Sequence, residues 1–458
     1  MMHIKSSRFR RLAKEGFWIL FGQVAAVIGA LVLVRVLTEH LNPEQYGQLA
    51  LGLTIAGLVN QVVMGGITAG IGRFYSIAAE TNDLPGYLHA SQWLMGYAVT
   101  AVAAIALLLM TGLLWLGYTQ WMGLAAVALI FSVLSGYNAS LSGIQNAARQ
   151  RAVVAFHGGL DAWLKILLAL AVMLWLGSSS TAVVLGYALS SLLVTGSQLI
   201  FLRQLIHRQH KNANTFANWR RQIWGYSWPF SVFGIFTWMQ QTSDRWALQT
   251  FASGHEVGLY AVVFQLGYVP IGLVMGMAMT FLGPILYQRS GNATDQNRNM
   301  TVHRIAWRFT FTGLLITALA FLFTLLLHEW LFQLLVAIKY HAVSNLLPWT
   351  VLAGGVFASG QMLALKLMTE MKSAVMTTAK IVTAILGVGL NIYGASQFGL
   401  QGVVVALVAF SSIYFIWMAW LTQLPPVSVD HDSRTLKMLN KHKLPQSDHL
   451  LTNSKDLS

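Results

Sequence analysis

The segment RVLTEHLNPEQYGQLALG, residues 35–52, lies between two long apolar runs. An arginine ends the first run, a turn with Pro43 and Glu44 follows, and Gly47 opens the second run. A membrane-spanning helix needs about 20 mostly apolar residues, and both runs reach that length. The segment therefore predicts a tight hairpin between two spanning helices.

The composition of the whole chain agrees with a membrane protein. Of 458 residues, 56% are hydrophobic and 10% are charged, whereas soluble proteins carry about 25% charged residues. The net charge of +14 does not indicate nucleic acid, because orientation in a bilayer already requires cytoplasmic Lys and Arg. The absence of cysteine excludes disulfides and thiolate chemistry. No metal-ligand spacing, phosphate-binding loop or nucleophile triad occurs, so we predict no metal, no cofactor and no enzymatic activity.

Twelve apolar stretches recur along the chain. They lie at residues 17–37, 47–69, 91–116, 121–143, 159–177, 182–202, 226–249, 258–283, 308–328, 345–367, 374–395 and 400–422. The first is longer than the apolar region of a signal peptide, so we predict that it is retained as a span. The fold class is therefore an all-α integral membrane protein with about twelve transmembrane helices.

Charged residues between the spans predict the orientation. All Lys and Arg except Arg35, Arg245 and Lys339 fall on the side of the N-terminus. Cytoplasmic segments carry the excess of Lys and Arg, so both termini are predicted to be cytoplasmic. The connections on the opposite side are short, which disfavours an enzyme that processes glycans there.

The opening segment has a counterpart, RWALQTFASGHEVGLYAVV, at residues 245–263. Again an arginine ends a span, a turn with a glutamate follows, and a glycine, Gly258, opens the next span. The two segments lie six spans apart, so both halves enter the membrane in the same direction. Such repeats are related by an axis along the membrane normal, with the binding site between them.

We accordingly predict two six-helix bundles around a central cavity, related by a pseudo-two-fold axis along the membrane normal. The predicted parts are a basic N-terminus (1–16), an N-terminal lobe (17–202), a basic linker (203–225), a C-terminal lobe (226–424) and a polar tail (425–458). This symmetry is typical of transporters, whereas an enzyme or a scaffold has no need of it.

Three stretches resemble the Wzx-type polysaccharide flippases, whose superfamily also holds multidrug exporters. They are FGQVAAVIGALVLVRVLTEHLNPEQYGQLALGLTIAGLV with the basic leader before it, GGITAGIGRF, and DRWALQTFASGHEVGLYAVV. The resemblance implies export of undecaprenyl-diphosphate-linked oligosaccharides across the bacterial inner membrane, for lipopolysaccharide O-antigen or exopolysaccharide assembly. It also implies membrane lipids, protons or sodium as a coupling ion, and polysaccharide polymerase or assembly proteins as partners.

Arg35 and Arg245 stand near the outer ends of spans one and seven. Charged side chains within spans are costly unless they face a cavity or a partner. Two roles are open: the arginines reach outward to the interface, or they stand at the mouth of a cationic cavity and bind phosphate oxygens.

A polar run precedes Arg245 and predicts a wet lumen: Gln240, Gln241, Thr242 and Ser243. Asp244 follows the run. It either neutralises a neighbouring arginine or binds and releases a proton during coupling.

At the cytoplasmic ends of their spans, Arg73, Lys366 and Lys380 are either interface anchors or an inner surface for a diphosphate group. Asp161 and Lys165 are spaced to pair on one helix face, mainly as a structural contact. Pro229 and Pro270 interrupt helix hydrogen bonding in spans seven and eight. They predict either packing kinks or the hinges of a lateral gate.

Three alternatives to a flippase stay open at the level of sequence. A cation-coupled multidrug exporter of the same superfamily would need a negative lumen, whereas most intramembrane charges here are positive. A polytopic glycan-processing enzyme and a scaffold for glycan assembly are the others. The glycan, the driving ion and the oligomeric state do not follow from the sequence.

Overall fold

The structure, a computed structural model, describes residues 2–206, 216–290, 295–370 and 373–423. These residues contain helices and turns but no strand. In chain order the elements are α1 (Met2–His40), α2 (Pro43–Val59), η1 (Asn60–Met64), α3 (Gly65–Glu80), α4 (Leu84–Trp115), η2 (Thr119–Trp121), α5 (Met122–Ala147), α6 (Arg151–Leu176), α7 (Ser180–Ile206), α8 (Phe216–Phe251), α9 (Gly254–Ser290), α10 (Gln296–Leu335), η4 (Ile338–Leu346), α11 (Leu347–Thr369) and α12 (Ser373–Gln423).

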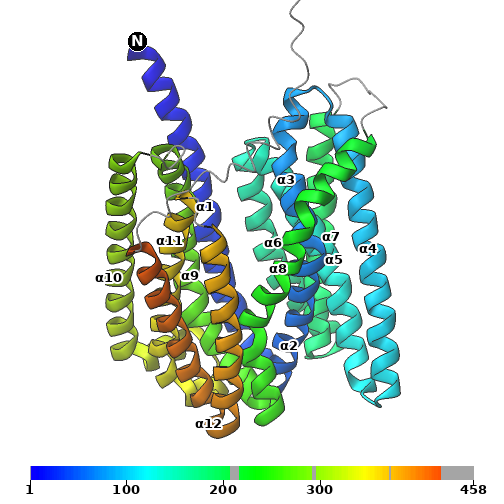
Figure 1. The fold of residues 1–458 in the computed structure, drawn as a ribbon. Helices are drawn as coiled ribbons and strands as arrows, with labels where there is room; N and C mark the ends of the chain where they lie inside the picture. Colours follow the sequence, from blue (N-terminus) through cyan, green and yellow to red (C-terminus); the bar gives the residue numbers. More distant parts are fainter. Residues whose placement is uncertain (1, 207–215, 291–294, 371–372, 424–458) are drawn as a thin grey trace, which may run out of the picture. The chain divides into compact units, whose positions relative to one another are not determined.

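Ten of these helical segments are long and apolar enough to cross a membrane. The π-helical turn η1 joins α2 and α3 into one span, and α12 consists of two helices that meet at Gly399, where φ is 56°. The polar helix α8 falls outside the ten, although it has 36 residues. The prediction of about twelve spans agrees with this all-helical, multi-pass architecture (Figure 1).

Two helices extend beyond the spans that the sequence predicts. The second span continues beyond 69 to Glu80, because no turn residue stops the helix before Asn82, whose φ is 55°. The first span likewise belongs to a longer helix, α1.

Within the described residues, the chain up to Thr422 forms one compact unit. The division into two six-helix bundles stays a prediction. The predicted polar tail, 425–458, and the middle of the predicted linker, 207–215, lie outside the described residues.

The predicted hairpin between the first two spans is confirmed. Helix α1 ends at His40, and Asn42 caps α2 by accepting a hydrogen bond from the Gln45 amide at 2.8 Å. Pro43 occupies the first turn of α2, where its missing N–H is not needed, and Glu44 follows it. The chain therefore reverses within two residues. We call this side of the molecule the hairpin end, and the side where α1 begins the basic end.

The two repeated segments meet at the hairpin end, where α2 packs against α9. A Cβ atom on Gly47 would lie 2.1 Å from the carbonyl oxygen of Gly254, and one on Gly258 would lie 1.7 Å from that of Pro43. Each repeat glycine thus contacts the first turn of the other helix. Only glycine allows this approach, since any side chain would collide with backbone.

A hydrophobic core joins the helices around this contact. Leu41, Leu248, Val257, Tyr260 and Phe332 are fully buried within one cluster. Between membrane helices such side chains stabilise the structure by close van der Waals packing. This packing holds the helix ends together beneath the hairpins and fixes the position of the cavity described next.

Candidate functional site

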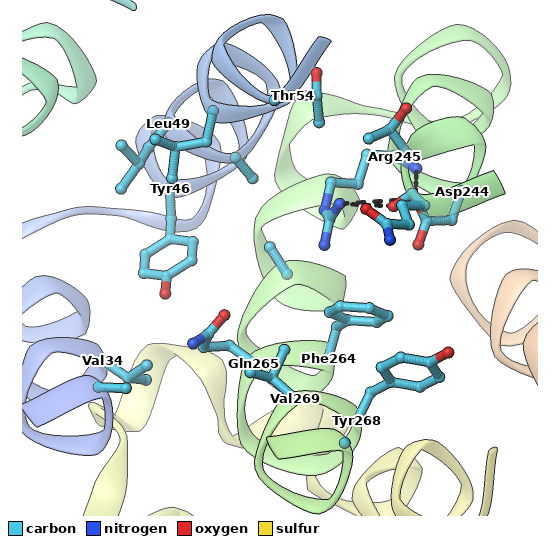
Figure 2. Close-up of a pocket in the computed structure, with 18 of the residues that line it drawn as sticks. Val34, Tyr46, Leu49, Thr54, Asp244, Arg245, Phe264, Gln265, Tyr268 and Val269 are labelled. Carbon is cyan, nitrogen blue, oxygen red and sulfur yellow. Dashed lines mark hydrogen bonds and ion pairs between the residues drawn. The ribbon is translucent and has the colours of Figure 1, made fainter. Parts of the chain in front are cut away.

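A cavity of about 660 Å³ lies where α1, α2, α8 and α9 approach one another. Most of its lining is apolar or aromatic, including Tyr46, Phe264 and Tyr268 (Figure 2). The rings of Phe264 and Tyr268 stack at 4.6 Å. A volume of this size, with few polar groups among apolar walls, is typical of small-molecule and cofactor sites.

The side chain of Arg245 projects from α8 into this cavity (Figure 2). Its Nη1 donates a hydrogen bond to the Gln241 carbonyl at 3.2 Å, and its Cζ lies 4.8 Å from the centre of the Phe264 ring. A guanidinium has five N–H donors, and within the described residues this one makes a single hydrogen bond. Arg245 therefore presents donors and positive charge to a ligand.

Asp244 also lines the cavity, but both of its carboxylate oxygens accept hydrogen bonds from protein groups. Its side chain is nearly buried, and its Oδ2 accepts a hydrogen bond from the Tyr260 hydroxyl at 2.6 Å. Its Oδ1 accepts one from the Arg245 amide at 2.7 Å and lies 4.0 Å from Arg245 Nη1. The long ion-pair distance leaves the guanidinium only partly neutralised.

The predicted polar run lines the cavity in part. Gln240, Gln241 and Thr242 belong to the wall, and Gln241 accepts a hydrogen bond at 2.8 Å from Gln61, which lies on η1. Ser243 instead accepts a hydrogen bond at 2.9 Å from Asn391 of α12. Four consecutive residues cannot share one face of a helix with 3.6 residues per turn.

Arg35 lies outside the residues that line the cavity. Its Nη1 donates a 2.7 Å hydrogen bond to the Val336 carbonyl, and its Nη2 lies 2.5 Å from the Glu39 carboxylate. The last carbonyls of a helix lack intrahelical partners, so a cation is stabilised there. Arg35 is thus positioned by the end of α10 and not by the cavity.

The three cations predicted near the basic end are likewise absent from the cavity lining. Lys366 is 1% exposed, pairs with Glu370 at 2.9 Å and donates to the Thr422 carbonyl at 3.1 Å. Lys366 is therefore held by protein contacts between α11 and α12, and its two predicted roles stay predictions. Arg73 is exposed on α3, and Lys380 is half-buried on α12.

Sequence reasoning missed several residues of the cavity wall. Lys165 lines it while pairing with Asp161 at 2.5 Å, the contact predicted as structural. Gln61 and Gln265 line it as well. Each of these glutamines is an isolated amide within an apolar span. This pattern could have identified them, since polar groups at membrane depth usually face the protein interior.

The predicted hinge residues lie within helices. Pro229 is on an exposed face of α8, and Pro270 is half-buried in α9 beside Val269, which lines the cavity. Their role as hinges stays a prediction.

Contacts between distant segments close the hairpin end. Thr38 Oγ1 accepts a hydrogen bond from the Ala337 amide at 3.2 Å, and the Tyr340 hydroxyl donates to the Leu41 carbonyl at 3.0 Å. Lys339 donates to the Glu39 carbonyl at 3.1 Å. Together with the contact between α2 and α9, these bonds tie α1 to the segment after α10.

Comparison with protein families adds a finding about the first two thirds of the chain. A family model described as "Polysaccharide biosynthesis protein" matches residues 12–289. No curated protein matches the chain.

Solved structures of similar fold are membrane transporters. A multidrug resistance MATE family transporter of the MOP superfamily, inward-facing, is 14% identical, with 88% of this chain and 94% of that chain covered and a TM-score of 0.60. The lipid II flippase MurJ, inward closed, is 12% identical, with 94% and 92% covered and a TM-score of 0.59. A MOP superfamily transporter from Pyrococcus furiosus, described as having a binding pocket of reversed polarity, is 14% identical, with 89% and 96% covered and a TM-score of 0.59. Identities this low show a shared fold alone.

Proposed function

Because the chain belongs to the polysaccharide biosynthesis protein family, we propose that it flips a polyprenyl-diphosphate-linked oligosaccharide across the bacterial inner membrane. Family membership confirms the resemblance to Wzx-type flippases that the sequence indicates. Both termini would be cytoplasmic, and the product would feed O-antigen or exopolysaccharide assembly. The fold shared with transporters of the MOP superfamily supports a transport role.

The observation that carries the substrate assignment is the environment of Arg245. Its guanidinium faces the cavity, while the nearest carboxylate, Asp244, is bound by Tyr260. A planar guanidinium binds phosphate oxygens in a bidentate manner, and it does so strongly where water is scarce. Gln61, Gln241 and Gln265 supply amides that match sugar hydroxyl groups. The diphosphate and the first sugars would occupy the cavity while the polyprenyl chain stays in the bilayer.

The closed hairpin end supports loading of the cavity from the basic, cytoplasmic end. Release on the other side requires the bonds of Thr38, Glu39 and Leu41 to break and α2 to separate from α9. A substrate shifts such an equilibrium only if it binds the two states with different affinity. In alternating access, these contacts would therefore break when the cavity opens at the hairpin end and form again when it closes there.

The test of this proposal is deletion of the gene in its own host. We expect surface polysaccharide to be lost and its lipid-linked precursor to accumulate on the cytoplasmic side, with restoration by the wild-type gene. Unchanged surface polysaccharide together with altered efflux of cationic dyes would assign the chain to the multidrug exporters instead.

Substitutions of Asp244 and Tyr260 are expected to change the affinity for a polyprenyl diphosphate in opposite directions. Asp244→Asn removes a negative charge near Arg245, so we expect the Kd for a polyprenyl diphosphate to fall about fivefold. Tyr260→Phe keeps the charge but frees the carboxylate to approach Arg245, so the Kd should rise by a similar factor. Binding to the purified protein is the measurement. A change of equal sign in both variants would contradict the proposed arrangement.

The buried ion pair of Lys366 yields a prediction about stability. Lys366→Met removes the buried ion pair with Glu370 at 2.9 Å, and breaking such a pair costs about 3–5 kcal/mol. We expect a clearly lower Tm in detergent, whereas Arg73→Met, at an exposed site, should leave the Tm nearly unchanged. Equal Tm values for the two variants would show that Lys366 is not a structural residue.

A further inference from the structure

A second cavity lies between α3, α4 and α8 and holds about 830 Å³. It opens to the surface, because two of its lining residues, Tyr97 and Trp224, are 51% and 52% exposed. Its wall is apolar over most of its length and basic at one end. The apolar part consists chiefly of Val62, Val63, Ile67, Leu94, Ala98 and Ala101.

A close-packed seam separates this groove from the central cavity, and no residue lines both. A Cβ atom on Gly234 of α8 would lie 2.5 Å from the Gln61 carbonyl, and one on Gly66 would lie 2.2 Å from the Ser231 hydroxyl. The same holds for Gly70 against Ser227, also at 2.2 Å. The backbone of η1 and α3 therefore lies directly against α8, and a ligand in the groove is a different molecule from one at Arg245.

Positive charge gathers at one end of the groove. Arg220 and Arg221 of α8 line it, and its lining contains no Asp or Glu. The Arg220 guanidinium lies 5.2 Å from the centre of the Trp93 ring. The basic end therefore complements an anion.

The depth of this basic end matches a lipid headgroup. Trp93 and Trp224 are 40% and 52% exposed and flank the arginines. Exposed tryptophans are enriched at the boundary between hydrocarbon and headgroups. The arginines precede the apolar part of α8, on the side of the molecule where α1 begins. Phosphate at the arginines would thus stand at headgroup depth, with hydrocarbon below it.

We propose that this groove is a binding site for an anionic phospholipid of the leaflet at the basic end. Arg220 and Arg221 bind its phosphate, and an acyl chain lies along Val63, Leu94 and Ala98. Basic pockets between transmembrane helices on the cytoplasmic side bind acidic headgroups by the same chemistry. The site is independent of the transported substrate. A lipid bound there bridges α4 and α8, the helix that carries Arg245, so it stabilises the wall of the central cavity.

The test measures lipid binding to the purified full-length protein, with phosphatidylglycerol and phosphatidylcholine as probes. We expect phosphatidylglycerol to raise the Tm more than phosphatidylcholine, as ligands of the folded state do. In the double variant Arg220→Gln, Arg221→Gln the Kd for phosphatidylglycerol should rise at least about tenfold, because charge-assisted hydrogen bonds are lost. The matched control is Arg298→Gln, Arg304→Gln, which removes two exposed arginines of α10 at the same end and should leave the Kd unchanged.

A third variant, Ala101→Trp, tests the same groove in case the arginine variant folds poorly. Ala101→Trp fills the exposed apolar part of the groove without touching the arginines, so it should also weaken phosphatidylglycerol binding. Three results would overturn the proposal. The control variant could lose as much affinity for phosphatidylglycerol as the Arg220→Gln, Arg221→Gln variant, or both groove variants could bind phosphatidylglycerol as the wild type does. Inorganic phosphate alone could also raise the Tm as much as phosphatidylglycerol does. Displacement of phosphatidylglycerol by undecaprenyl diphosphate would likewise overturn it, in favour of a substrate-lipid site. These outcomes are read from binding and do not depend on the flippase assignment.

Discussion

Gly258→Val is expected to abolish transport while the protein still inserts into the membrane. A Cβ atom at this position would lie 1.7 Å from the Pro43 carbonyl oxygen, and backbone cannot move aside as a flexible side chain can. The helix ends must therefore separate, and the state in which the hairpin end is closed is lost. Gly47→Val should act in the same way, since its Cβ atom would lie 2.1 Å from the Gly254 carbonyl.

The closed state can be followed directly because the chain has no cysteine. Leu41 is fully buried at the hairpin end, so a Leu41→Cys protein should react slowly with a membrane-impermeant maleimide applied from that side. Adding Gly258→Val should increase the labelling rate strongly. Gly196→Val is the control, because a Cβ atom on that exposed glycine of α7 meets no atom within 4 Å. Normal transport by Gly258→Val would show that the contact between α2 and α9 plays no part in the cycle.

Arg245→Ala is expected to reduce transport about 100-fold at low substrate concentration. The substitution removes two charge-assisted hydrogen bonds to phosphate, each contributing about 1.5–3 kcal/mol. The measurement is the rate at which a fluorescent polyprenyl-diphosphate oligosaccharide moves from one leaflet of proteoliposomes to the other. Arg245→Lys should recover only part of the activity, since an ammonium group keeps the charge but not the planar pair of donors.

Arg35→Ala is the matched control for this experiment. Arg35 holds the corresponding place in the first repeat, but its guanidinium contacts the Val336 carbonyl and the Glu39 carboxylate. Its side chain is 40% exposed, so its loss should cost below about 1 kcal/mol. We expect Arg35→Ala to change substrate affinity less than threefold. Equal loss of affinity in both arginine variants would remove Arg245 as the specific phosphate ligand.

The sequence was informative about the hairpins because their signals are local. Asn42, Pro43 and Glu44 are the residue types that begin a helix, and they begin α2. The spacing of Gly47 and Gly258 in the two repeats identified residues that do meet in the structure. The sequence did not show why glycine is needed at these positions. The reason is a contact between backbone segments that lie more than 200 residues apart in the chain.

The cavity was harder to predict, as Ser243 and Lys165 illustrate. Ser243 belongs to a polar run but contacts Asn391 of α12, while Lys165, predicted as part of a structural pair, lines the wall. Helical rotation of about 100° per residue decides which side chain faces inward. A run of polar letters carries no information about which neighbouring helix each one meets.

The sequence by itself determined the membrane class and the hairpin between the first two spans. These follow from the lengths of apolar runs and from local capping residues, which act on the chain whatever packs beside it. Only the tertiary structure decided that Arg245 faces a cavity while Arg35 binds the end of α10. The two arginines stand at equivalent places in their repeats, so their difference arises from the helices packed around them, and distant residues supply those contacts.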